Sequence, residues 1–239
     1  MRANGYIIHL TRATQRMPQV EWIQKNCSLS LDVIDAVDGR TLNHAQLAAY
    51  KENIHKPYYP FTLSHAEIAA FHSHRECWRR IAEGEYEAGL ILEDDLEFDP
   101  AQFTRAVNLV LSVATVDSYV RFPIQEREVF KYKFNPEKDI FIYRPKVIGL
   151  GAVGQIVGKN AAKHLLEATE VFDRPVDTFL QMRWVHRVDV ISIWPSTIRE
   201  VSAHLGGSLI QKKTHFISKV SRELERFIYR YRNRKYSRM

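Results

Sequence analysis

The sequence predicts an α/β fold, a single domain with a mostly parallel central sheet flanked by helices. Short apolar runs alternate along the chain with longer segments whose apolar residues recur at helical spacing, which is the pattern of strands covered by helices. One run, residues 89–92, is bounded by Gly84 and Pro100 and reads as a buried strand. The 239 residues suffice for one large domain. We therefore assign residues 1–210 to this domain and residues 211–239 to a basic helical tail.

The first third of the chain supplies two strands and three helices. The Asp38-Gly39 turn closes the second strand, and two prolines mark residues 56–61 as a loop. Ser64 and Glu67 form a capping box, in which each side chain satisfies a free backbone N–H at the start of a helix. In chain order, the predicted elements are strand 6–10, helix 15–26, strand 31–37, helix 43–51 and a helix from 64 to 84.

The strand over residues 89–92 ends in three consecutive carboxylates, Glu93, Asp94 and Asp95. A buried strand that stops in acids delivers them to the edge of the sheet where open α/β sheets bind ligands. Alternation along a strand places Glu93 and Asp95 on one side and Asp94 on the other. Oxygen-rich clusters suit a hard divalent cation such as Mg²⁺ or Mn²⁺. The alternative is a solvated acidic turn.

The rest of the domain continues the alternation of strands and helices. Asp99-Pro100 begins another helix. Gly149, Gly151 and Gly154 match a dinucleotide-binding spacing, but they lie mid-chain without the first-strand context of that motif, so close backbone packing or substrate approach is favoured. The remaining elements are strands 119–122 and 140–143, an apolar Gly-rich segment 146–158, helices 160–169 and 176–184, and strand 188–193.

The composition points to the cytoplasm. Two cysteines form no disulfide framework, which fits a reducing compartment. The apolar run near the N-terminus is too short for the core of a signal peptide. No run approaches the roughly 20 apolar residues of a membrane span.

The charge is concentrated in the tail. Residues 211–239 contain ten Lys or Arg and two Glu, a formal charge of +8, whereas the other 210 residues contain 24 basic and 26 acidic residues, a charge of −2. Apolar residues recur at helical spacing within the tail, and basic amphipathic helices of this kind bind anionic membrane surfaces. A nucleic-acid-binding arm lacks any supporting motif in the body, and packing onto the domain is the third interpretation. The apolar positions are Phe216, Val220, Leu224, Phe227 and Tyr231.

Between residues 6 and 210 the chain resembles glycosyltransferase family 25, which acts in lipopolysaccharide and lipooligosaccharide synthesis and has relatives among collagen galactosyltransferases. The order and spacing of several short motifs carry the resemblance. It departs from the family pattern at His9, Thr11 and Gln155. The motifs are Leu10-Thr11-Arg12 with Arg16, Ala36-Val37-Asp38-Gly39-Arg40, Ser73-His74, Trp78-Arg79-Arg80-Ile81, Leu90-Ile91-Leu92-Glu93-Asp94-Asp95, Arg174-Pro175-Val176-Asp177 and Trp194-Pro195.

The resemblance implies an inverting, metal-assisted transferase with a GT-A-like fold that uses a UDP-hexose. Asp95 is then the direct contact to Mn²⁺ or Mg²⁺, Glu93 a second or water-mediated one, and Asp94 a ribose or structural partner. Asp177 is the candidate for the base that accepts the acceptor's proton, although an acid favoured by the start of a helix is equally consistent.

Five further residues are candidates for donor binding. The arginine forks suit the oxygens of a diphosphate, and the aspartate and glycine of the second-strand turn suit the nucleoside. Each has an ordinary structural alternative, namely a surface arginine, a common turn or a helix-face histidine. The candidates are Arg12, Arg16, Asp38, Gly39 and His74.

The leading hypothesis is transfer of galactose or glucose to a lipooligosaccharide or another cell-surface glycan, with a lipid-linked acceptor at the inner face of the cytoplasmic membrane. A metal-dependent phosphoester hydrolase is the enzymatic alternative. A non-catalytic membrane- or nucleic-acid-binding protein with a degenerate transferase body is the third, although we expect no nucleic acid as partner.

Overall fold

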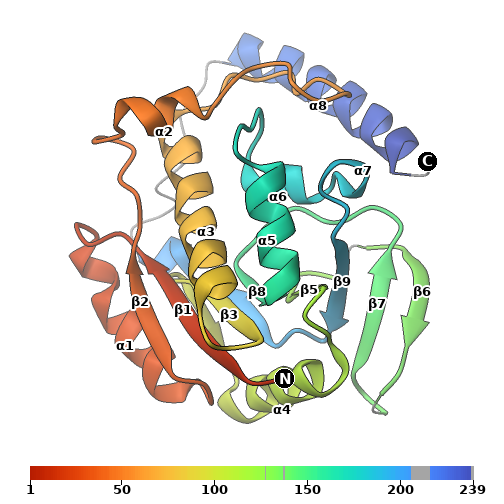
Figure 1. Cartoon of the computed structure of the whole chain (residues 1–239). Coiled ribbons are helices and arrows are strands. Elements are labelled where there is room, and N and C mark those ends of the chain that lie inside the picture. The colour runs from red at the N-terminus through yellow and green to blue at the C-terminus, as the bar shows by residue number, and fades with distance from the viewer. Residues whose placement is uncertain (127, 137, 206–215, 238–239) are drawn as a thin grey trace.

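The computed structural model describes residues 1–126, 128–136, 138–205 and 216–237, with the side chains of the last helix described from residue 222. Its centre is an eight-stranded sheet in the order β2-β1-β3-β8-β5-β9-β7-β6 (Figure 1). In this described part of the chain, six strands point the same way and only β8 and β7 run against them. The strands are β1 (Ala3–His9), β2 (Leu31–Asp35), β3 (Ala88–Glu93), β5 (Ser118–Arg121), β6 (Phe130–Phe134), β7 (Phe141–Pro145), β8 (Gly154–Gly158) and β9 (Asp189–Trp194).

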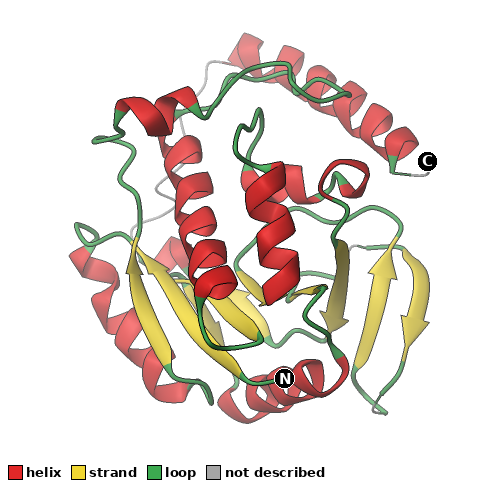
Figure 2. Ribbon diagram, in the orientation of Figure 1, coloured by secondary structure: helices red, strands yellow, loops and turns green. Residues whose placement is uncertain are grey.

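Helices cover both faces of the sheet, as Figure 2 shows. On one face α3 (His65–Glu83), α5 (Lys159–Ala168), α6 (Val176–Leu180) and α7 (Arg183–His186) pack over Ile91, Tyr119 and Val157. On the other, α1 (Met17–Asn26) and α4 (Pro100–Val113) pack over Leu90 and Ile156. Neighbouring residues of β3 and β8 thus enter opposite cores, as a doubly covered sheet requires. The prediction of an α/β fold with a mostly parallel central sheet is confirmed.

Short elements complete the domain. A 3₁₀ turn, η1 (Thr14–Arg16), precedes α1, and α2 (His44–Ala48) precedes α3. Directly after the acids, β4 (Leu96–Phe98) pairs with β10 (Ile198–Glu200) in a separate two-stranded sheet, and η2 (Ser202–His204) follows. The capping box of Ser64 and Glu67 is present at the start of α3, which ends before Gly84 as predicted. The tail contributes α8 (Phe216–Tyr236).

The sequence prediction was wrong at two places. The predicted helix 176–184 is broken into α6 and α7, because Leu180 and Met182 would lie about 200° apart around one continuous helix, and the break lets both be buried. The polar segment before residue 140 contains an edge strand, β6, which alternates aromatic residues with Lys131 and Lys133. Lysines of this kind are common on edge strands because they discourage pairing with another chain.

Within the described residues, none of the helices combines the length and the apolar character needed to cross a bilayer.

Candidate active site

Asp94 is the buried member of the acidic triplet. Its side chain accepts a hydrogen bond of 2.5 Å from Arg16 Nη1 and lies 2.7 Å from His9 Nδ1. Arg16 comes from η1 and His9 is the last residue of β1, which lies beside β3 in the sheet. All three side chains are nearly inaccessible. The geometry places Asp94 as a structural anchor beneath the site rather than on its surface.

Arg16 also reaches the third acid. Its Nη1 donates to Asp95 Oδ2 at 3.0 Å, while only 4% of the residue is exposed. The expected diphosphate ligand is thus a buried residue that holds two neighbouring carboxylates in place. Burial, followed by repulsion from Glu93, nevertheless raises the pKa of Asp95 from 3.8 to about 7. One guanidinium does not offset the negative charge gathered here.

Glu93 is the most accessible acid of the three, with 33% of its side chain exposed. It faces His74 of α3, whose Nε2 lies 3.5 Å from Glu93 Oε1. On the other side of the ring, Gln155 Nε2 lies 3.1 Å from His74 Nδ1. An amide NH₂ is only a donor, so Nδ1 accepts and the proton of the neutral ring sits on Nε2, toward Glu93. Gln155 and His74 thereby orient this carboxylate.

The turn after β2 forms an accessible rim. Arg12 Nε donates to Asp38 Oδ2 at 2.6 Å, and hydrogen bonds from Arg12 and from the Arg40 backbone N–H lower the pKa of Asp38. Gly39 is packed so closely that an added Cβ would lie 2.9 Å from the backbone of His65 at the start of α3. Both residues are thus fixed, Asp38 by its ion pair and Gly39 by close packing.

Asp177 lies in the first turn of α6. Its Oδ2 accepts from the Gly151 backbone N–H at 3.0 Å, and its Oδ1 accepts from the N–H of Thr178 at 2.6 Å. Gly151 has φ of +94°, a conformation that favours glycine, and the space where a Cβ would stand is open. The Gly-rich segment therefore holds the candidate base, a link that the spacing of its glycines did not reveal.

A buried polar network lies between the two acidic positions. Arg121 of β5 pairs with Glu128 and donates to the backbone oxygens of Leu150 and Gly151. The same Glu128 accepts from Tyr143 and from Ser192 on neighbouring strands. Sequence reasoning missed this network, although a charged residue inside an otherwise apolar predicted strand was a usable signal. It fixes the loop that holds Asp177.

Tyr119 is a buried residue whose hydroxyl is influenced by both acidic positions. Its ring belongs to the core between the sheet and the helices, and its hydroxyl has no hydrogen-bond partner among the residues that the structure describes. Burial raises its pKa; Arg121 lowers it, and both Glu93 and Asp177 raise it further. The Glu93 backbone N–H donates to the Val153 oxygen at 2.9 Å, and Asp177 accepts from Gly151 two residues earlier, so Glu93 and Asp177 lie at the same end of the sheet.

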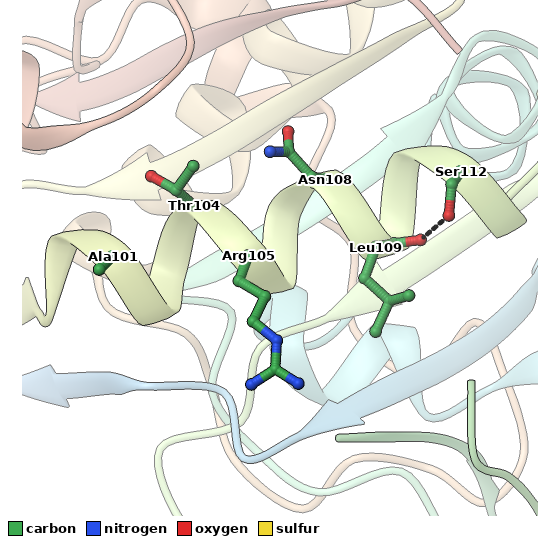
Figure 3. Close-up of a pocket in the computed structure, with 6 residues that line it drawn as sticks. All are labelled: Ala101, Thr104, Arg105, Asn108, Leu109 and Ser112. Carbon is green, nitrogen blue, oxygen red and sulfur yellow. Dashed lines mark hydrogen bonds between the residues drawn. The ribbon is translucent and has the colours of Figure 1, made fainter. Parts of the chain in front are cut away.

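Two surface depressions lie elsewhere. One is an open hollow along α4, lined by outward-facing side chains (Figure 3). The other lies beside Trp194-Pro195 and Ile198. Neither contains Glu93, Asp95 or Asp177, and their linings hold no group of convergent carboxylates. The chemistry of the side chains therefore identifies the site better than concavity does. The hollow in Figure 3 is lined by Ala101, Thr104, Arg105, Asn108, Leu109 and Ser112.

Comparison with known protein families gives one match that covers most of the chain. The family model described as glycosyltransferase family 25 (LPS biosynthesis protein) matches residues 2–180, which include all three acids and Asp177. The chain belongs to glycosyltransferase family 25. The predicted family is thereby confirmed.

Animal members of family 25 are the curated relatives. A glycosyltransferase 25 family member of Drosophila pseudoobscura pseudoobscura is 31% identical over 47% of this chain. Procollagen galactosyltransferase 2 of Mus musculus is 26% identical over 75% of it, and the probable inactive family member 3 of Rattus norvegicus is 26% identical over 88%. The matches cover only 19%, 30% and 38% of these relatives' own lengths.

One solved structure is similar at low sequence identity. It is a glycosyltransferase involved in the glycosylation of the major capsid of PBCV-1, with a TM-score of 0.37 and 10% identity. The match covers 70% of this chain and 65% of that one.

The residues of this family 25 chain fit a divalent cation held by two protein groups. Asp95 follows Glu93 by two residues, and the pKa of Asp95 is raised first by burial and then by repulsion from Glu93, a repulsion that a bound cation would offset. In the residues that the structure describes, no three His, Cys, Asp or Glu converge in a geometry suited to a metal. Two carboxylates completed by water and substrate phosphates are a common arrangement for Mg²⁺.

Proposed function

We propose that this protein is an inverting glycosyltransferase that moves a hexose, galactose or glucose, from a UDP-sugar to a lipooligosaccharide or another cell-surface glycan. Family 25 membership supports glycosyl transfer, and relatives named procollagen galactosyltransferases favour galactose. The observation that carries the proposal is the pair Glu93 and Asp95 at the end of β3, with Asp177 at the same end of the sheet through the backbone contacts of Val153 and Gly151.

Mn²⁺ or Mg²⁺ belongs to the proposal, with Asp95 and Glu93 as the residues that would hold it. The bound cation would neutralise the charge that develops on the leaving diphosphate. Around it the protein keeps the acids in place: Arg16 and Asp94 fix Asp95 from below, while His74 orients Glu93. Arg12 and Asp38, with Gly39, contribute an accessible rim for the nucleotide, since their ion pair leaves donors and acceptors on the outer side.

Asp177 is proposed as the base. Inversion requires a carboxylate that takes the proton of the acceptor hydroxyl on the face opposite the leaving group. Two backbone N–H groups orient the Asp177 carboxylate. Its Oδ1 also accepts from the Thr178 hydroxyl at 3.2 Å, whereas Oδ2 keeps a lone-pair direction for the acceptor hydroxyl. The network of Arg121 and Glu128 stabilises this arrangement through the loop at Gly151.

The acceptor side of the proposal includes the tail. An acceptor linked to lipid would bring the enzyme to the inner face of the cytoplasmic membrane, and the charge of +8 in residues 211–239 suits an anionic surface. The proposal includes no nucleic-acid partner, because residues 1–210 carry a formal net charge of −2.

The two alternatives stay distinguishable. A phosphoester hydrolase would require further metal ligands, and among the described residues no such cluster accompanies Glu93 and Asp95. A non-catalytic protein is the remaining candidate, because one relative is named as probably inactive.

Calorimetric titration with UDP, with and without Mn²⁺, is the first test, followed by a panel of UDP-hexoses scored for UDP release. We expect Mn²⁺-dependent UDP binding that Asp95→Ala abolishes and that Glu97→Ala leaves intact, since Glu97 lies two residues along on β4 and its side chain is 40% exposed. Failure of UDP to bind in either condition would refute the proposal, and hydrolysis of simple phosphoesters without sugar transfer would establish the hydrolase.

A further inference from the structure

Over residues 222–236, where its side chains are described, α8 has an inner face against the domain and an exposed outer face. Tyr229 and Asn233 lie on the inner face, where 7% and 2% of these residues remain exposed. Residues four apart lie on one side of a helix, so this face is continuous along its axis. Figure 1 shows α8 along the top of the molecule, over the side that carries α6 and α7.

The contacts of the inner face are specific. Arg174 Nη1 donates to the Tyr229 hydroxyl at 2.8 Å, and Arg174 itself is fully buried in an ion pair with Asp173. Asn233 Nδ2 donates to Gln181 Oε1 at 2.7 Å. A buried arginine that relies on a tyrosine of the tail ties α8 firmly to the domain.

The outer face of α8 is apolar. Leu224, Phe227 and Tyr231 are 60%, 67% and 68% exposed, and Ile228 is 39% exposed. Their spacing of three and four residues gathers them in one stripe on the side opposite Tyr229. We call these four residues the outer stripe. A helix that merely packs on a domain turns its apolar stripe inward, whereas here the apolar stripe faces outward.

We infer that the outer stripe is the surface by which the enzyme docks on an anionic lipid bilayer, while the inner face keeps α8 attached to the transferase domain. Two large aromatic side chains and two aliphatic ones suit the boundary between headgroups and acyl chains. Basic side chains around such a stripe attract anionic headgroups.

Charge favours a bilayer over a second copy of this chain as the occupant. Residues 222–237 contain six Lys or Arg and two Glu, a charge of +4. Two such helices placed stripe to stripe would bring these like charges together, which opposes association. An anionic membrane offers the opposite charge. Arg230, Arg232 and Arg234 are exposed and free to meet it.

The inference deepens the proposed function, in which the acceptor is borne by lipid, but its test requires no sugar transfer. Because the stripe and the inner face lie on opposite sides of α8, docking leaves Tyr229 and Arg174 joined. The protein would therefore sit on the membrane as a rigid body and not on a detached tail.

The test compares co-sedimentation of the full-length protein with phosphatidylcholine vesicles that contain or lack phosphatidylglycerol. The variant Leu224→Ser with Phe227→Ser removes two members of the stripe, and Tyr86→Ser with Val113→Ser is the matched control, since these are 43% and 41% exposed and lie away from α8. We expect the stripe variant to lose about tenfold or more in partitioning into anionic vesicles, with unchanged circular dichroism and melting temperature, and the control to behave as wild type.

A third variant, Arg230→Gln with Arg234→Gln, should weaken binding to anionic vesicles alone, and added salt should have the same effect. Wild-type partitioning by the stripe variant would overturn the inference. So would a dimer, seen by light scattering, that the stripe substitutions dissociate, because the occupant would then be a second copy. If vesicle binding follows this pattern but no UDP-sugar is used, the docking surface stands and the proposed function fails.

Discussion

Asp95 should lower the free energy of unfolding while it contributes to the active site. The substitution Asp95→Asn measures both effects. Only 13% of its side chain is exposed, and burial beside Glu93 raises its pKa from 3.8 to about 7. Between these two values the folded protein binds the proton more tightly than the unfolded chain does. Stability conferred by the protonated form is therefore present below pH 4 and is lost as the pH rises through 7.

The size of the effect follows from the shift. A difference of about three pKa units corresponds to about 4 kcal/mol at pH 8, where both states are ionised. Asparagine keeps the shape and removes the charge, while Arg16 retains its pairing with Asp94. We expect Asp95→Asn to raise the free energy of unfolding by up to about 4 kcal/mol at pH 8 and to change it little at pH 4.

Urea unfolding of metal-free protein across this pH range is the assay, with Glu97→Gln as the control because that acid lies two residues away on β4 and its side chain is 40% exposed. Manganese should stabilise the wild type and leave Asp95→Asn unaffected, and transfer should be lost. A variant that is less stable than wild type at pH 8, or whose difference is independent of pH, would show that Asp95 is not a strained carboxylate.

Three further predictions concern other parts of the domain. Asp177→Asn should keep UDP affinity in calorimetry and lose most of kcat, because an amide cannot accept the acceptor's proton; lost UDP affinity with a normal kcat would move Asp177 to the donor site. Tyr229→Phe should lower the free energy of unfolding by about 1–3 kcal/mol, because it leaves a donor of the buried Arg174 unsatisfied, and an unchanged urea midpoint would contradict the contact. Burial lowers the pKa of His186 from 6.5 to about 4, so stability should fall by up to about 3 kcal/mol as the pH drops from 6.5 to 4, and an equally steep loss in His186→Gln would assign it to other groups.

The sequence by itself determined the fold class, the caps and the place of the acids. The capping box at Ser64 and the alternation of strands with helices depend on contacts within a few residues, and local pattern reads such contacts directly. The position of the acids followed from one buried strand, whereas the alternation of side chains did not extend to Asp94 and Asp95, because β3 ends at Glu93 and Arg16 Nη1 donates to both aspartates. Which side chains lie at the end of a strand depends only on the sequence of that strand and of the residues directly after it.

Only the tertiary structure decided which of these residues meet. Arg16 was a candidate diphosphate ligand because arginine forks suit phosphate oxygens, yet it lies beneath Asp94, which is 78 residues away along the chain. The strand order placed β8 between β3 and β5 and so brought Gln155 beside His74. The apolar stripe of α8 faces outward because the hydrogen bond from Arg174 holds Tyr229, on the opposite side of the helix, against the domain. Each of these facts is a pairing between distant segments, and a local pattern carries no information about which distant partner a side chain will find.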